Sequence, residues 1–136
     1  YIQQYYSFVN FLSIKIMGLR FNYLLVLYEK IIQMRNLNNK DWKSGFENAE
    51  EAQIIDVRTP AEYAEGYIPN SKLINIKNPA GFTEEVEKLD PNKSYYVYCR
   101  SGARSEMACQ VMENMGFKDV NNLATGIMEW DGTIEK

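Results

Sequence analysis

One stretch of the sequence, residues 95–116, constrains the fold of this chain more than any other. It begins with three tyrosines and a valine at residues 95–98, an aromatic and β-branched run that predicts a buried strand. From Arg104 onward, five apolar side chains recur at helical spacing: Met107, Ala108, Val111, Met112 and Met115. Gly116 follows, where a helix commonly ends on glycine. The stretch therefore predicts a strand, a short loop and a helix, the repeating unit of a parallel α/β sheet.

The loop between this strand and this helix, CRSGAR at residues 99–104, has the composition of a site for a reactive cysteine. Unpaired main-chain N–H groups converge at a helix N-terminus, which also carries a partial positive charge. Arg100 and Arg104 add two full charges. Such surroundings lower a cysteine pKa from about 8.5 and favour the nucleophilic thiolate. The same cradle suits an oxyanion such as thiosulfate or phosphate. The alternative, that Cys99 is only a small buried hydrophobe, leaves the glycine and the two arginines without a purpose.

Strand and helix signals alternate on both sides of this unit. Strands are expected at residues 52–57, 72–76 and 117–123. Helices are expected to begin with Asn39 as N-cap, with Thr59 as N-cap before Pro60, and at Phe82. This alternation predicts an α/β domain whose central, mostly parallel sheet is flanked by helices, with the CRSGAR loop at the C-terminal end of a strand.

Further motifs stand before and after the loop. The sequence reads IDVR at residues 55–58, EY at 62–63 and GYIP at 66–69, and Gly126 and Trp130 follow later. Together with CRSGAR, these motifs resemble the rhodanese family of sulfurtransferases over about residues 37–132. Tyr67 stands where that family usually has histidine, and we expect the change to affect local packing rather than catalysis. The resemblance implies a rhodanese-like three-layer fold for residues 36–136.

The resemblance also implies an activity. In the rhodanese family the loop cysteine accepts a sulfane sulfur, becomes a persulfide and passes the sulfur to a thiophilic acceptor. This makes Cys99 the expected catalytic residue. The expected substrate-binding residues are Arg100, Ser101, Gly102, Ala103, Arg104 and Ser105. The implied partners are a small anionic donor such as thiosulfate and an acceptor that is cyanide, a thiol or a protein. No metal or organic cofactor is implied.

Three other functions stay open. The domain could be a persulfide relay whose partner is a protein, a regulatory binding module without significant thiosulfate turnover, or a phosphatase. Phosphatases of the same fold place five residues between cysteine and arginine, whereas four separate Cys99 from Arg104. The smaller loop formed by four intervening residues favours the binding of a persulfide or thiosulfate over that of a phosphoryl group. The intact cysteine and the two arginines argue against an idle module.

Asp56 and Arg58, at the end of the strand expected at residues 52–57, allow two interpretations. They could be a catalytic carboxylate and an anion-binding guanidinium, or a charge-paired network that supports the strand end. We favour the supporting role. Cys109 lies five residues beyond Arg104 on the expected helix, about 7.5 Å along its axis. That position suits a resolving cysteine poorly, because the sulfurs must come within bonding distance.

The composition excludes several other functions. The net charge of −3 gives no general affinity for nucleic acid. The chain has no histidine, which excludes histidine-dependent triads and most zinc sites. Two cysteines, one of them in a reactive setting, indicate a reducing compartment rather than a disulfide scaffold, so we expect a cytoplasmic location.

Residues 1–35 form an apolar and basic N-terminal extension that differs from the rest of the chain. Four basic residues oppose Glu29 alone, and charges interrupt each apolar run too soon for a membrane-spanning helix. No pattern of a secretory signal is evident. Three interpretations stay open: an amphipathic helix packed on the domain, an interfacial membrane anchor, or sequence that is not native coding sequence. The last arises because the chain starts at Tyr1 and Met34 stands just before the family pattern.

Overall fold

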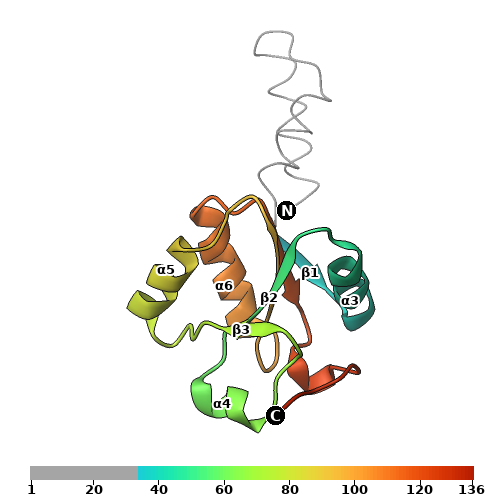
Figure 1. The fold of residues 1–136 in the computed structure, drawn as a ribbon. Helices are drawn as coiled ribbons and strands as arrows, with labels where there is room; N and C mark the ends of the chain where they lie inside the picture. The colour runs from blue at the N-terminus through green and yellow to red at the C-terminus, as the bar shows by residue number, and fades with distance from the viewer. Residues whose placement is uncertain (1–33) are drawn as a thin grey trace, which may run out of the picture. The chain divides into compact units, whose positions relative to one another are not determined.

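Five parallel strands form the centre of the structure, a computed structural model that describes residues 34–136 (Figure 1). In spatial order they are β1 (Met34–Leu37), β5 (Asp119–Leu123), β4 (Ser94–Tyr98), β2 (Ala52–Asp56) and β3 (Ser71–Leu73). All four neighbouring pairs run parallel. The strand that leads into the CRSGAR loop, β4, therefore lies in the middle of the sheet, with a neighbour on each side.

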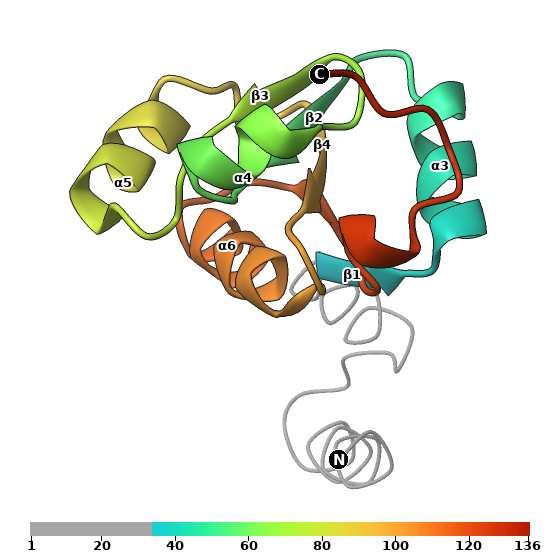
Figure 2. The ribbon, with the colours of Figure 1, turned by 90° about the horizontal axis from the view of Figure 1, so that it is seen from below.

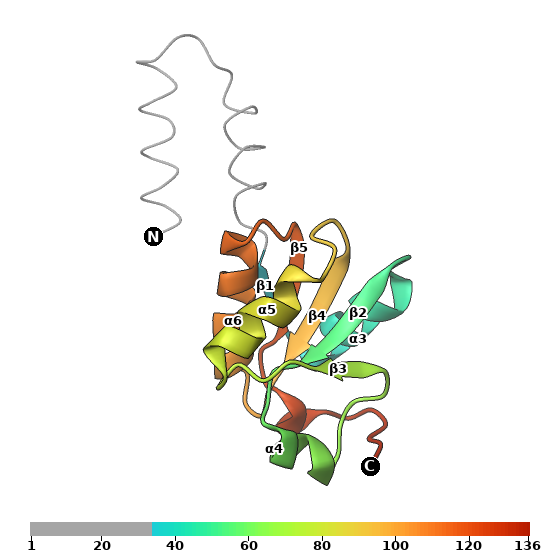
Figure 3. The same cartoon turned by 60° about the vertical axis from the view of Figure 1, so that its left-hand side comes forward.

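Helices cover both faces of this sheet. α3 (Asn39–Asn48) lies on one face, and α5 (Pro79–Glu87) and α6 (Ala103–Asn114) lie on the other, as Figure 2 shows. α4 (Pro60–Glu65) and the short 3₁₀ helix η1 (Ile127–Glu129) lie beyond the C-terminal ends of the strands (Figure 3). The expected three-layer arrangement is confirmed, and the sheet of the described residues is entirely parallel.

The aromatic strand β4 contributes to the core on both faces of the sheet. Tyr95 and Val97 belong to the cluster under α5 and α6, whereas Tyr96 and Tyr98 belong to the cluster under α3. All four side chains are buried. Trp42 of α3 meets Tyr96 and Tyr98 edge-on, with ring centroids 5.5 and 6.4 Å apart. Edge-on aromatic pairs stabilise a core by about 0.5–1.5 kcal/mol each beyond their buried area, so the base of the loop is firmly held.

The edge strand β1 was not expected from the sequence. Its four residues pair in parallel with β5, from Met34 opposite Val120 to Leu37 opposite Leu123. Its sequence, MRNL, shows no clear alternation, and its two middle residues are exposed. An ion pair of 2.9 Å between Arg35 and Asp119 adds to the pairing. Such a strand is held by its neighbour rather than by its own propensity, which is why the pattern did not reveal it.

Other element boundaries differ by a few residues. The cap expected from Asn39 comes from Asn38, whose side chain accepts from the N–H of Asp41 at 2.9 Å. The strand expected at 72–76 is the shorter β3, and the helix expected from Phe82 already begins at Pro79. Thr59 does cap α4, in a reciprocal capping box with Glu62.

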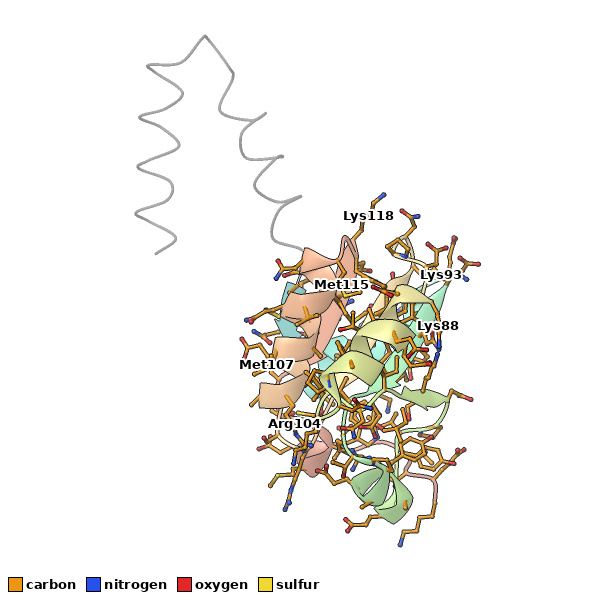
Figure 4. All side chains as sticks on the ribbon, turned by 90° about the vertical axis from the view of Figure 1, so that its left-hand side faces the viewer. Lys88, Lys93, Arg104, Met107, Met115 and Lys118 are labelled. Atoms are coloured by element: carbon orange, nitrogen blue, oxygen red, sulfur yellow. The ribbon has the colours of Figure 1, made fainter. Side chains whose placement is uncertain are left out.

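The apolar residues that recur at helical spacing in α6 do not all face the core. Met107 is one of them, yet it is 59% exposed. The buried residues of α6 are instead Ser105, Ala108, Cys109 and Met112. These recur at intervals of three and four, and they turn Met107 to the adjoining, solvent-facing side (Figure 4).

The predictions for residues 1–33 lie outside the described residues, so the three interpretations of the N-terminal extension and its boundary at residue 35 stay predictions. Within residues 34–136, no helix has the length and apolar character needed to cross a bilayer.

Candidate active site

The loop that carries Cys99 is shaped by two glycines that leave no room for a side chain. Gly102, the N-cap of α6, has φ of 97°, and a Cβ there would overlap the carbonyl oxygen of Ala124. Gly126 has φ of 63°, and a Cβ there would overlap the carbonyl group of Arg100. The loop at residues 99–102 therefore lies backbone to backbone against the loop at residues 123–126. Only glycine permits this contact at both positions.

Three carbonyl groups of the cysteine loop, those of Cys99, Arg100 and Gly102, accept hydrogen bonds from residues outside the loop. The N–H groups of Ile127 and Met128 donate to the carbonyls of Cys99 and Arg100, at 2.9 and 3.1 Å. Asn122 donates from Nδ2 to the carbonyl of Gly102 at 3.1 Å. Because these oxygens are held on the outside, the N–H groups of the loop are free to turn inward toward the cysteine.

The sulfur of Cys99 accepts hydrogen bonds inside this loop. Its Sγ accepts from the N–H of Gly102 at 3.1 Å and from the hydroxyl of Ser105 at 3.3 Å. Cys99 is only 1% exposed, and burial by itself raises the pKa of its thiol. The Ser105 hydroxyl and the N–H groups of Ser105, Ser101 and Gly102 outweigh burial, so the pKa of Cys99 is lowered. The site thus favours a thiolate at the start of α6.

Arg104 and Glu62 form an ion pair beside this loop. Both terminal nitrogens of Arg104 donate to Glu62, Nη1 to Oε2 at 2.8 Å and Nη2 to Oε1 at 2.7 Å. Figure 4 shows Arg104 at the end of α6 that faces α4. The hydrogen bond from Arg104 is the main reason that the pKa of Glu62 lies well below its usual range. Arg104 is therefore at the site but is already neutralised by a carboxylate.

The other loop residues differ in their exposure. Ser101 and Ala103 are exposed, whereas Ser105 and Gly102 are buried. Arg100 is exposed, and its guanidinium makes no hydrogen bond or ion pair with any residue in the described range 34–136. Arg100 is consequently the loop cation whose charge is not compensated by a bonded carboxylate.

Asp56 and Arg58 form a buried pair at the end of β2. The Nη2 and Nε atoms of Arg58 donate to the Asp56 carboxylate at 2.6–3.0 Å. Nη2 also donates to the carbonyl of Gly66 at 2.8 Å, and the guanidinium lies 5.6 Å from the Tyr98 ring centre. Burial opposes the charge of Arg58, but the Asp56 carboxylate raises its pKa overall. The pair fastens the segment after α4 to the sheet, and none of its hydrogen bonds reaches Cys99.

Sequence reasoning gave no site role to Glu62 or Asn122. Thr59 and Glu62 carry the spacing of a capping box, a signal that places Glu62 at the start of a helix but not opposite Arg104. Asn122 is buried in β5 and links Asn36 of β1 to the carbonyl of Gly102. Its only signal is a polar residue within an expected strand. No group of metal-ligating side chains occurs within residues 34–136.

Comparison with known proteins agrees with this geometry. The model of the rhodanese-like domain family matches residues 38–133. The chain belongs to this family. The rhodanese-like domain is 37% identical over 101 residues to YtwF of Bacillus subtilis, provisionally named a sulfurtransferase, covering 74% of this chain and 94% of YtwF. It is 36% identical over 83 residues to a sulfurtransferase of Allochromatium vinosum, covering 61% of this chain and 75% of that protein.

A solved structure confirms the rhodanese-like fold. A rhodanese-like domain protein from Staphylococcus aureus matches with a TM-score of 0.65 and 32% identity, over 75% of this chain and 97% of that one. The family match and the named relatives support a sulfurtransferase.

Tyr67, where rhodanese-like domains usually have histidine, lies at the GYIP segment. Its ring stacks on that of Tyr63, with centroids 4.2 Å apart and planes at 5°. Its main chain exchanges two hydrogen bonds of 2.9 Å with Glu135. These contacts hold the segment after α4 against the C-terminal residues.

Proposed function

We propose that this rhodanese-like domain transfers sulfane sulfur through a persulfide on Cys99, from an anionic donor such as thiosulfate to a thiophilic acceptor. The observation that carries the proposal is the position of the Cys99 sulfur. It accepts from the Gly102 N–H and the Ser105 hydroxyl at the start of α6, with a lowered pKa. A thiolate held in this way is a nucleophile at neutral pH.

The proposed cycle has two balanced steps. The Cys99 thiolate attacks the outer sulfur of thiosulfate, an S–S bond forms to Cys99, and the S–S bond of the donor breaks. Sulfite leaves with the electron pair, and Cys99 becomes an anionic persulfide. Cyanide or a thiolate acceptor then attacks the outer persulfide sulfur, takes it, and returns Cys99 as a thiolate. No oxidant or reductant is consumed.

The loop residues have defined roles in this proposal. The main-chain N–H groups of residues 100–105 stabilise the thiolate, the donor anion and the persulfide. Arg100 adds an uncompensated charge, and Arg104 adds a charge that Glu62 partly cancels. Asp56 and Arg58 support the site by holding the strand end. The two free thiols suit a reducing compartment such as the cytoplasm.

The test is thiosulfate-to-cyanide sulfur transfer by the full chain and by the Cys99→Ser variant. We expect the variant to lose activity by at least about 10³-fold, because the covalent step requires the thiolate. Cys109→Ala, which changes a thiol buried in the middle of α6, serves as the matched control and keeps its activity. Equal activity of wild type and Cys99→Ser would contradict the proposal.

A protein-facing sulfur relay is the second candidate. The favouring observation is the likeness to YrkF of Bacillus subtilis, provisionally named a sulfur carrier protein, which is 37% identical over 95 residues; the chain spans 49% of its length. A relay would load Cys99 with sulfur but release it slowly to cyanide. Fast loading with slow cyanide turnover would favour it.

A further inference from the structure

Of the two arginines in the cysteine loop, one has its charge neutralised by a bonded carboxylate within residues 34–136 and the other does not. Glu62 takes both terminal nitrogens of Arg104 at 2.7 and 2.8 Å. Arg100 has no such partner within residues 34–136. With the thiolate of Cys99 included, the two positive charges are balanced by two negative ones. A dianion that approaches this loop therefore meets little net attraction from side chains.

Glu62 is held in place by more than Arg104. Its Oε2 also accepts from the N–H of Thr59 at 3.1 Å and from the Thr59 hydroxyl at 2.9 Å. These bonds belong to the capping box that begins α4. The carboxylate is thus fixed at one place between α4 and α6, where its side chain is 24% exposed. A charge fixed in this way acts on every donor that reaches the loop.

From these contacts we infer that Glu62 is a specificity-determining residue, which weakens the binding of dianionic donors and favours sulfur donors of low charge, such as a hydropersulfide. The inference rests on the proposed persulfide function and names its substrate class. A neutral hydropersulfide reacts without a dianion entering the loop. The Cys99 thiolate attacks its outer sulfur, and the S–S bond of the donor breaks with its electron pair on the inner sulfur. The proton of the outer sulfur passes to this leaving thiolate, so that a neutral thiol is released and Cys99 carries the anionic persulfide.

The variant Glu62→Gln removes the charge of this side chain and keeps the capping box of α4. Glutamine serves at this position of a capping box as glutamate does, so its side chain can still accept from Thr59. It no longer cancels the charge of Arg104. The matched control is Glu65→Gln, which removes the same charge from the other end of α4. The Glu65 side chain is exposed and makes no hydrogen bond or ion pair within the described residues.

The experiment measures the rate of Cys99 persulfide formation by intact mass, at varied concentrations of thiosulfate and, separately, of cysteine hydropersulfide. For Glu62→Gln we expect the half-saturating thiosulfate concentration to fall by roughly 3- to 10-fold at low ionic strength, as a Coulomb effect of one charge on a dianion. Added salt should shrink the difference. The rate with hydropersulfide should stay within about twofold of wild type, because this donor is not a dianion. Both rates of Glu65→Gln should also stay within about twofold, because the exposed Glu65 side chain is not paired with Arg104.

Each contrary outcome has its own meaning. An unchanged half-saturating thiosulfate concentration in Glu62→Gln would overturn the inference alone, since the Glu62 charge would then have no effect on binding. A raised concentration would overturn it too, since Glu62 would then orient Arg104 for binding. Equal slowing with both donors would overturn it as well, because it would indicate damage to the loop. If neither donor loads Cys99 in wild type, the proposed function fails, and the inference fails with it.

Discussion

Cys99 and Cys109 lie in the same hydrophobic core, and each is at most 1% exposed, yet their pKa values move in opposite directions. Burial acts to raise both. For Cys109 the negative charges of Glu113 and Glu106 add to burial, and its pKa is raised far above the ordinary value. For Cys99 the Ser105 hydroxyl and the loop N–H groups outweigh burial, and its pKa is lowered.

Because both cysteines are buried, the opposite pKa directions follow from their positions relative to the start of α6. The N–H groups in the middle of α6 already donate to carbonyls one turn earlier, so main-chain donors contribute least among the causes that act on the pKa of Cys109. At the start of α6 these groups have no helical partner, and the backbone contact at residues 123–128 directs them to Cys99. Three predictions test this comparison, beginning with the largest effect.

The largest expected effect is the difference in alkylation between the two cysteines of the folded protein. At pH 7 we expect iodoacetamide to modify Cys99 at least about 10³-fold faster than Cys109, whose reaction requires opening of the helix. Digestion and peptide mass spectrometry give the two rates separately. Comparable rates in the native protein would contradict the assigned difference between the two cysteines. Comparable rates are expected in denaturant.

The second prediction concerns the glycine that shapes the loop. Gly102→Ala should lower the free energy of unfolding by about 3 kcal/mol. The new Cβ would overlap the carbonyl of Ala124, and the alanine would have to adopt a left-handed backbone conformation. The Gly102 N–H should also move away from Cys99, and its alkylation at neutral pH should slow.

Gly116→Ala is the matched control for that change. Gly116 has φ of 95°, close to the 97° of Gly102, but within residues 34–136 no atom beyond its two chain neighbours lies within 4 Å of an added Cβ. We expect the backbone strain alone to cost about 1–2 kcal/mol and Cys99 to react as before. Denaturant unfolding of both variants checks the order, and equal losses would show that the contact with Ala124 contributes nothing.

The smallest expected effect comes from one hydroxyl. Ser105→Ala removes the Oγ donor that lies 3.3 Å from the Cys99 sulfur. Because this bond favours the thiolate, we expect the pKa of Cys99 to rise in this variant. At pH 7 the alkylation rate should then fall by up to about tenfold. A pH titration of that rate measures the shift.

Ser101→Ala controls for the loss of a hydroxyl from the loop. The Ser101 side chain is exposed and forms no hydrogen bond within residues 34–136, although its N–H contributes to the cradle. We expect the pKa of Cys99 to stay the same in this variant. A lower pKa in Ser105→Ala would contradict the assignment of Ser105 as a donor.

The sequence alone was sufficient for the features that depend on local signals. Three features could be predicted from a few neighbouring residues each: the aromatic strand β4, the cap at Thr59 and the loop from Cys99 to Arg104. The alternation of strands and helices predicted the mostly parallel sheet flanked by helices, and the family resemblance implied its three-layer form.

The features that were missed depend on partners far along the chain. β1 exists because β5 pairs with it, and Arg104 is neutralised because α4 brings Glu62 beside it. The exposure of Met107 could not be predicted, because the spacing of apolar residues in α6 does not show which side of the helix meets the sheet.

The most direct test of the central claim is to locate the transferred sulfur. The full chain is loaded with thiosulfate or cysteine hydropersulfide, alkylated and digested with trypsin, which separates Cys99 in residues 94–100 from Cys109 in residues 105–118. We predict one additional sulfur atom on the peptide of Cys99 and none on the peptide of Cys109. Sulfur on Cys109, or on neither peptide of the folded protein with either donor, would contradict the assignment of Cys99 as the sulfur carrier.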